Sequence, residues 1–235
     1  MNSLKELERH IPEIEQKIDY VFKDKSLLLN AFVHRSFLNE HRTTVHAHNE
    51  RLEFLGDSVL GLIISEYLYH LLPTHPEGQL SQLRSKIVDA ASCAYYLQKL
   101  VLADYILLGR GEKLGEGKSK TSILADAFEA IIGSIFVDGG EKAARAFILG
   151  HFSEEITQVI GSPPRNCKAD LQDYSQKKYQ KPPRYEVIQE TGPEHGKMFH
   201  VKVWINDQEM GTGTGNSKKE AEQKAAAEAL AALQL

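Results

Sequence analysis

The spacing of apolar residues divides the chain into two parts with different patterns. Before the glycine at position 161, apolar residues recur at helical spacing, and no segment alternates with a period of two. We therefore expect the first part to be all-α. Glycine, proline and capping signals place its helices at the following residues: 4–18, 25–37, 50–71, 79–100, 119–137 and 141–160.

The second part combines helical and strand patterns. The odd-numbered residues from Phe199 to Ile205 are apolar, so they share one face of a strand. An Ala-rich helix begins at Ser217, which has the capping-box spacing to Glu220. A helix, three strands and a helix are predicted at these residues: 168–179, 184–190, 197–205, 208–215 and 217–233. This α-β-β-β-α order predicts a three-stranded antiparallel sheet with both helices on one face.

The change of pattern coincides with a linker signal. In GSPPRN, residues 161–166, a glycine and two prolines end the preceding helix and stiffen the chain. The sequence thus predicts an all-α domain over residues 1–160 and a small α+β domain over residues 167–235.

Composition places the chain among ordinary soluble proteins. Of its 235 residues, 42% are hydrophobic and 26% are charged. The N-terminal residues have no apolar core of the signal-peptide type, and no apolar run approaches the ~20 residues of a membrane span. Cys93 and Cys167 are the only cysteines, which suits a reducing compartment and is too few for a cysteine-ligated structural zinc. We expect a cytoplasmic protein without a disulfide and without a membrane partner.

Net charge alone predicts no particular partner. Residues 1–160 hold 17 Lys and Arg against 22 Asp and Glu, whereas residues 161–235 hold 11 against 10. An acidic larger part argues against nucleic-acid binding unless its acids have a specific use. The positions of individual charges therefore have to decide.

Five of those acids lie on apolar helices. In HNERLEFLGDSVLGL, Glu50, Glu53 and Asp57 fall within an arc of roughly 60° on one side of the predicted helix. In DAFEAIIGSIFVDGG, Asp126 and Glu129 are three residues apart and point the same way. Helices that each present carboxylates can bind divalent metal between them.

Oxygen ligands favour Mg²⁺ or Mn²⁺ over zinc or copper. Mg²⁺ held by a few carboxylates keeps bound waters, one of which can attack a phosphodiester. Alternatively, the acids are solvated helix ends or ion-pair partners of Arg51 and Arg84. Five acids on two apolar helices favour the metal site, whereas Glu66, a lone acid, is interpreted as structural.

Two further patterns are weaker. His41, His46 and His48 include an H-x-H pair, but no cysteine or nearby histidine completes a tetrahedral zinc site, so we interpret them as surface residues. The glycine-rich GRGEKLGEGK and GTGTG lack the phosphate-loop form and are interpreted as turns.

The small domain carries a basic signal at its last helix. Lys218 and Lys219 lie in the first turn, where positive charge opposes the helix dipole. That placement suits a helix start that faces phosphates, although a solvated charge pair is the alternative. Gln172 and Gln176, four residues apart, and His195 in TGPEHG are further candidate contacts with sugars and base edges.

These motifs resemble those of bacterial ribonuclease III. NERLEFLGDSVL is similar to the signature of that family and DAFEAIIGSIFVDGG to its second acidic motif. GTGNSKKEAEQKAA resembles the late motif of a double-stranded-RNA-binding domain. The resemblance covers essentially the whole chain, in the domain order of the family.

The resemblance implies a role for each candidate residue. Metal ligands would be Glu53, Asp57, Asp126 and Glu129, with Asp57 and Glu129 the most critical for catalysis. Glu50 and Glu77 would be peripheral acids, and Phe54 would insert into the partner subunit. RNA contacts would come from Gln172, Gln176, His195, Lys218 and Lys219.

The resemblance also implies an activity. The expected protein is a homodimeric nuclease that depends on Mg²⁺, for which Mn²⁺ can substitute. Each subunit is expected to cut one strand of an RNA duplex. The products carry 5′-phosphates and short 3′ overhangs, and the substrates are precursors of ribosomal RNA and other structured transcripts. One rival, a non-cleaving double-stranded-RNA-binding regulator, would lack some of the acids. A second, a phosphohydrolase for small nucleotides, would not need residues 166–235.

Overall fold

The computed structural model describes residues 3–43, 45–113, 118–161, 166–193 and 196–233. The chain forms two compact units, Met1–Pro164 and Arg165–Leu235. Each unit has its own hydrophobic core. In the described parts of the chain, no helix is both long and apolar enough to cross a bilayer.

Among the described residues of the larger unit, the regular secondary structure is helical, apart from one isolated bridge between Val33 and Leu107. This confirms the predicted all-α character of the first part. Its helices, with one short 3-10 helix η1, have the following bounds: α1 (Leu4–Ile18), α2 (Lys25–Ala31), α3 (Arg35–Glu40), α4 (Glu50–Leu71), α5 (Glu77–Ile87), α6 (Ala90–Lys99), η1 (Ala103–Tyr105), α7 (Arg110–Lys113) and α8 (Lys118–Gly161).

Two segments that we expected to be single helices are each broken by a capping residue. The break between α2 and α3 ends at His34, whose Nδ1 accepts a hydrogen bond from the backbone N–H of Ser36. The break between α5 and α6 ends at Asp89, whose carboxylate accepts from the backbone N–H of Ser92 at 2.7 Å. Aspartate is a common N-cap, so the sequence carried this second signal inside an otherwise helical pattern.

Helix α8 changes direction at Gly140, which has φ 76° and ψ −174°. The neighbouring Asp138 carboxylate ties this bend to the N-terminal segment, because it accepts hydrogen bonds from the Tyr20 hydroxyl and from the backbone N–H groups of Lys23 and Asp24. The two helices predicted on either side of this point are therefore present, joined at a glycine that can adopt the left-handed conformation.

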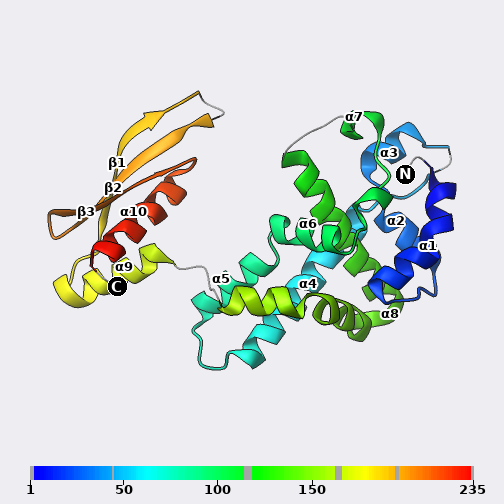
Figure 1. Ribbon diagram of the computed structural model, residues 1–235, viewed down its shortest axis with the longest axis horizontal. Helices are drawn as coiled ribbons and strands as arrows, with labels where there is room; N and C mark the ends of the chain where they lie inside the picture. Colours follow the sequence, from blue (N-terminus) through cyan, green and yellow to red (C-terminus); the bar gives the residue numbers. More distant parts are fainter. Residues whose placement is uncertain (1–2, 44, 114–117, 162–165, 194–195, 234–235) are drawn as a thin grey trace. The chain divides into compact units, whose positions relative to one another are not determined.

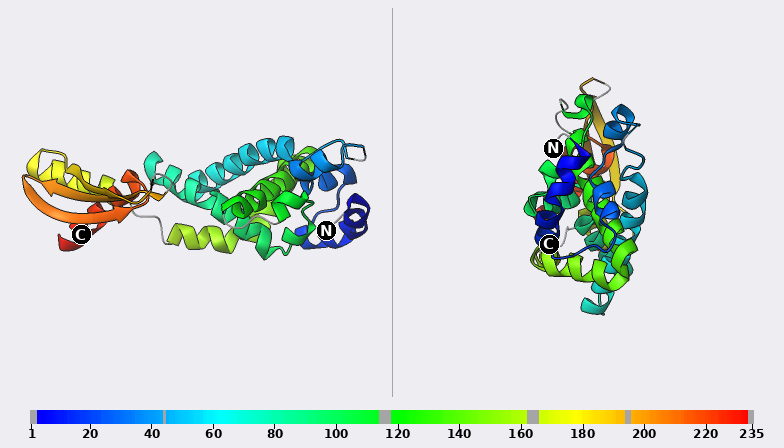
Figure 2. Two further views of the ribbon diagram at one scale, coloured as in Figure 1. Left: turned by 90° about the horizontal axis from the view of Figure 1, so that it is seen from above. Right: turned by 90° about the vertical axis from the view of Figure 1, so that its right-hand side faces the viewer.

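The centre of the larger unit is the pair α4 and α8. Both views show these two helices side by side, with α6 also packed against α8 (Figures 1 and 2). Their buried faces supply much of the core, including Ile63 and Ile64 from α4 and Phe128 and Ile132 from α8. The two predicted carboxylate helices are thus direct neighbours.

The smaller unit has the predicted α-β-β-β-α order. An antiparallel sheet in the order β1-β2-β3 carries both helices on one face, where Val201 and Val203 pack with Leu171 of the first helix and Ala225 of the last (Figure 1). The elements are α9 (Cys167–Tyr179), β1 (Arg184–Thr191), β2 (Met198–Ile205), β3 (Gln208–Gly215) and α10 (Lys218–Ala232).

For GTGTG, the predicted strand over residues 208–215 is confirmed and the interpretation as a turn is wrong. The interpretation of the other glycine-rich segment as a turn is wrong at residues 110–113. GTGTG belongs to β3, and residues 110–113 form the short helix α7. The strand needs these glycines because α10 packs directly against its backbone. A Cβ at Gly213 would lie 2.1 Å from the carbonyl oxygen of Ala221.

Candidate metal centre and RNA-binding surface

Two glycines let the backbones of α4 and α8 approach closely. A Cβ at Gly56 would lie 1.8 Å from the carbonyl oxygen of Glu129, and one at Gly133 would lie 2.1 Å from that of Leu52. Any larger residue would push the helices apart. The close approach occurs beside the acidic residues, so these glycines set the distance between carboxylates that the two helices present. A glycine inside a helical pattern was the available sequence signal.

Three carboxylates meet at this crossing. Glu53 of α4 and Asp126 and Glu129 of α8 each offer an oxygen, and these oxygens all lie within 4.8 Å of one another. All three side chains are partly buried. A set of convergent carboxylate oxygens suits a hard divalent cation such as Mg²⁺.

Burial and mutual repulsion disfavour the charged forms of these acids. The pKa of Glu129 is raised to about 8, first by burial and then by the charges of Asp57, Asp126 and Glu53. Burial, followed by the charges of Asp126 and Glu50, also raises the pKa of Glu53. The pKa of Asp126 is raised by burial, against an opposing influence of His34. A bound cation would lower these pKa values again, because it favours the ionised carboxylates. The cluster is therefore suited to bind a cation.

Asp57 is not one of the three residues whose carboxylate oxygens converge. It lies on α4, four residues after Glu53, and its side chain is exposed. Its charge nevertheless raises the pKa of Glu129, which places it within electrostatic reach of the cluster.

Glu50 and Glu77 have other partners. Glu50 is exposed at the start of α4, where Arg35 Nη1 lies 3.5 Å from one carboxylate oxygen and His48 Nδ1 lies 3.8 Å from the other. Glu77 is exposed at the start of α5 and accepts a hydrogen bond from the Ser81 hydroxyl at 2.8 Å.

The alternative interpretation was that the five acids form ion pairs with Arg51 and Arg84, and the structure does not support it. Within the described ranges, Arg51 and Arg84 form no ion pair with the five acids, and Arg84 instead donates to the Ser65 hydroxyl at 3.2 Å. Of the candidate zinc histidines, His41 stacks on Phe37 with ring centroids 4.1 Å apart. Glu66 pairs with Arg145, as its structural interpretation implies.

A neighbour of Glu129 escaped the sequence reasoning. Cys93 of α6 is fully buried, and its thiol donates to the carbonyl oxygen of Val88 at 3.7 Å. The neighbouring thiol also opposes the rise of the Glu129 pKa. Burial, then the Glu129 charge, raises the pKa of the Cys93 thiol itself. A single cysteine in an apolar helical stretch gave no signal of this contact.

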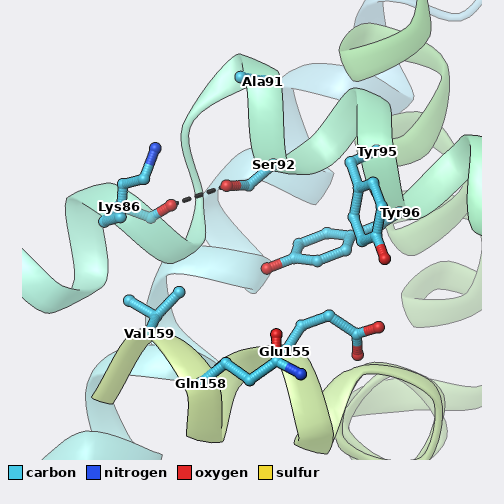
Figure 3. Close-up of a pocket in the computed structure, with 8 residues that line it drawn as sticks. All are labelled: Lys86, Ala91, Ser92, Tyr95, Tyr96, Glu155, Gln158 and Val159. Carbon is cyan, nitrogen blue, oxygen red and sulfur yellow. Dashed lines mark hydrogen bonds between the residues drawn. The ribbon is translucent and has the colours of Figure 1, made fainter. Parts of the chain in front are cut away.

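A groove of about 770 Å³ opens between α6 and the last turns of α8 (Figure 3). Its walls include Tyr95, Tyr96, Glu155 and Gln158, and none of the five candidate acids lines it. The Tyr96 hydroxyl donates to the carbonyl oxygen of Ile87. The groove and the carboxylate cluster thus lie at different places. We place the candidate site at the carboxylates, because their oxygens can hold a metal ion that acts on a phosphodiester.

In the smaller unit, the candidate RNA residues are exposed on two helices. Gln172 and Gln176 lie one turn apart on α9, and Lys218 and Lys219 lie in the first turn of α10. His195 lies outside the described residues. All four side chains are open to solvent, as contact with a duplex requires.

The start of α10 is capped by its own side chains. The Ser217 hydroxyl accepts from the backbone N–H of Glu220 at 3.2 Å, and the Glu220 carboxylate accepts from the N–H of Asn216. Lys218 Nζ lies 3.5 Å from Glu190 and over the Phe199 ring. These capping hydrogen bonds stabilise a helix start that carries two unfavourably placed lysines.

One side of α4 is apolar and exposed. Phe54 is 78% exposed and Leu62 is 60% exposed, and their spacing, with that of Tyr69, keeps all three within an arc of roughly 80° on the helix. Large apolar side chains exposed along one stripe make this side of α4 a candidate contact surface.

Both units match known protein families. Residues 24–156 match the family described as Ribonuclease-III-like, and residues 167–233 match the double-stranded RNA binding motif. Ribonuclease 3 of Protochlamydia amoebophila (strain UWE25) is 56% identical over 235 residues, which is 100% of this chain and 97% of that protein. Ribonuclease 3 of Caldanaerobacter subterraneus subsp. tengcongensis is 46% identical over 221 residues, which is 94% of this chain and 96% of the relative.

Among solved structures, the nuclease domain of ribonuclease III from Campylobacter jejuni is 43% identical with a TM-score of 0.56, covering 61% of this chain and 96% of that one. The fold and these matches define the class: a helical endoribonuclease domain followed by a double-stranded-RNA-binding domain. The chain belongs to the ribonuclease III family.

Proposed function

We propose that this protein cleaves both strands of double-stranded RNA in a Mg²⁺-dependent reaction, with Mn²⁺ as a substitute. The observation that carries the proposal is the convergence of carboxylates from α4 and α8, in a chain that also has a double-stranded-RNA-binding unit. The products are expected to be duplexes with 5′-phosphates and short 3′ overhangs.

The carboxylates have defined tasks in this proposal. Glu53, Asp126 and Glu129 would hold the metal, with Asp57 as a fourth ligand from the exposed side of α4. Mg²⁺, when bound, supplies an activated water and neutralises charge on the phosphate. Asp57 and Glu129 are the residues whose loss should be most damaging. The fit is supported by the donor set, which is all oxygen and repels itself without a cation.

The small unit would hold the duplex by its shape. Gln172, Gln176 and the His195 loop would reach 2′-hydroxyls across the wide minor groove, while Lys218 and Lys219 would bind phosphates. Such a module spans ~16 base pairs and reads little sequence. Precursors of ribosomal RNA and other structured transcripts in the cytoplasm are the expected substrates.

The second strand would be cut by a second copy of the chain. One carboxylate cluster serves one in-line attack, and a C₂ homodimer supplies a second cluster related by the twofold symmetry of a duplex. Phe54, with Leu62 on the same side of α4, would anchor that interface.

A cleavage assay tests the activity. A perfect RNA duplex incubated with the protein should be cut on both strands in Mg²⁺ and left whole with EDTA, as read on a denaturing gel. A non-cleaving regulator would instead bind the duplex and leave it intact in both conditions.

A mixed dimer tests the assignment of one strand to each subunit. Wild-type and Glu129→Gln chains carrying different tags, co-expressed and purified together, should give mainly duplexes with single breaks. Paired cuts at the wild-type rate, or complete inactivity, would refute two independent one-strand sites.

A further inference from the structure

Glu50 differs from the other acids of the cluster in what it faces. It is not one of the three side chains whose oxygens converge, and both of its carboxylate oxygens face basic groups: Arg35 Nη1 at 3.5 Å and His48 Nδ1 at 3.8 Å. An acid that is bracketed by two bases is poorly placed to give both oxygens to a metal ion.

The backbone fixes Arg35 beside Glu50. The N–H of Asn49, the residue before Glu50, donates to the carbonyl oxygen of Val33 at 2.9 Å, and the N–H of His34 donates to that of Leu107 at 3.1 Å. The residue that precedes α4 is thus hydrogen-bonded to the segment that leads into α3. Arg35 and Glu50 are the first residues of these two helices, so their proximity belongs to the fold and not to a chance rotamer.

We propose that Arg35 binds a backbone phosphate of the RNA strand next to the phosphate at the carboxylates, and that Glu50 is the positioning residue that holds Arg35 there. The inference rests on the proposed function, because it requires RNA to lie over the acidic cluster.

The state of Arg35 suits this role. Its side chain is 65% exposed, and among the described residues its one ion pair is the long contact with Glu50. Exposed ion pairs of this kind are weak, so the guanidinium can turn to a stronger acceptor. Its planar N–H donors match the oxygens of a phosphate.

The position of Arg35 also meets an electrostatic need. The charge of Glu50 raises the pKa of both Glu53 and Asp126, so Glu50 lies within reach of the cluster and Arg35 lies at its rim. A polyanion approaching five acids is repelled before any metal contact forms. A permanent cation at the rim offsets that repulsion where the neighbouring phosphate must pass.

The experiment measures KM and kcat for duplex cleavage by the full chain in saturating Mg²⁺ over a range of salt concentrations. Arg35→Gln should raise KM about threefold to tenfold, make the dependence of log KM on log salt shallower by about one, and leave kcat within about twofold. Arg35→Lys should restore the slope. Arg9→Gln, which removes an exposed arginine from α1, is the matched control and should behave like wild type.

A second variant separates positioning from metal binding. If Glu50 positions Arg35, Glu50→Gln raises KM and leaves the Mg²⁺ concentration for half-maximal rate unchanged, whereas Glu53→Gln raises that concentration. Melting temperatures check that each variant is folded. The proposal is overturned if Arg35→Gln keeps the wild-type salt slope, or if Glu50→Gln shifts the Mg²⁺ requirement as Glu53→Gln does. Failure of the wild-type protein to cut would instead refute the proposed function itself.

Discussion

Glu129 in the larger unit and Lys219 in the smaller unit are ionisable side chains of opposite type in opposite surroundings. Glu129 is partly buried among other acids, and its pKa is raised to about 8 by that burial and by repulsion from Asp57, Asp126 and Glu53. Lys219 is exposed at the start of α10. The buried acid needs a cation before it can act as a charged group, whereas the exposed lysine is already charged and is screened by salt. The larger unit thus presents the partly buried carboxylate cluster, and the smaller unit presents the exposed lysines.

The largest effect should come from the acid at the centre of the cluster. Glu129→Gln is almost isosteric and removes one ligand charge, so cleavage in Mg²⁺ should fall to at most a few per cent of the wild-type rate. Duplex binding, measured without cleavage by gel shift in EDTA, should change by less than about twofold, because the lysines lie in the other unit.

Glu66→Gln is the control for that change. Glu66 lies on α4 and pairs with Arg145, away from the three convergent oxygens. The Glu66→Gln variant should therefore cleave the duplex at nearly the wild-type rate. If Glu129→Gln still cuts well, the carboxylates are not the reaction centre and the contrast between the two units disappears.

The next largest effect should come from the helix crossing that brings the acids together. A Cβ at Gly133 would lie 2.1 Å from the carbonyl oxygen of Leu52, so Gly133→Ala must separate α4 from α8. Overpacking of this kind costs about 1–3 kcal/mol. We expect a melting temperature lower by several degrees and a cleavage rate at least tenfold lower at standard Mg²⁺.

Gly150→Ala provides the comparison within the same helix. A Cβ at Gly150 has open space around it, so alanine should stabilise the helix by about 0.5–1 kcal/mol and leave cleavage unchanged. Equal behaviour of the two variants would show that the close approach does not govern the site.

The exposed lysines should give a smaller effect that depends on salt. Lys218→Ala combined with Lys219→Ala should weaken binding of all duplex sequences alike. The slope of log affinity against log salt should become shallower by about one for each phosphate that the protein no longer neutralises. The rate at saturating RNA should hardly change. An unchanged slope would mean that the two lysines are solvated charges, which the contact of Lys218 with Glu190 would then explain.

The last effect concerns stability without metal. The folded-state pKa of Glu129, about 8, lies above its ordinary value of 4.5, so the folded protein holds a proton that the unfolded chain releases. This contribution to the free energy of unfolding is present below pH ~4.5 and is lost as the pH rises toward ~8. In EDTA, the melting temperature of Glu129→Gln should therefore gain on that of wild type as the pH increases.

Mg²⁺ should remove this difference, because a bound cation favours the ionised carboxylate. Melting curves of both proteins, with EDTA and with Mg²⁺ at several pH values, make the comparison. A gap that stays constant across the pH range would mean that Glu129 does not titrate as its surroundings indicate.

Local patterns were sufficient for much of this protein. Helical spacing marks the first part as all-α, and the alternation of Val201, Val203 and Ile205 marks a strand with one buried face. The same spacing places Glu53 with Glu50 and Asp57, and Asp126 with Glu129, on common sides of their helices. Each inference uses residues a few positions apart, where backbone geometry alone fixes direction.

Helix ends were less predictable than helices. The breaks before His34 and Asp89 fall inside helical patterns, because a capping residue competes with the apolar spacing around it. At Gly213 the predicted strand over residues 208–215 is correct and the interpretation as a turn is wrong, since the glycine allows close packing of α10 and does not form a bend. The residues around a glycine do not by themselves distinguish a glycine in a turn from a glycine that permits close packing.

Only the tertiary structure decided which charges meet. Glu53 and Glu129 are far apart in the chain, and the contact of Gly56 and Gly133 with the facing backbones brings their oxygens together. Glu50 shares the side of α4 that carries Glu53, yet the chain leading into α3 places Arg35 against it. A helical pattern fixes the direction of a side chain relative to its own axis, but the neighbour in that direction depends on how the helices pack.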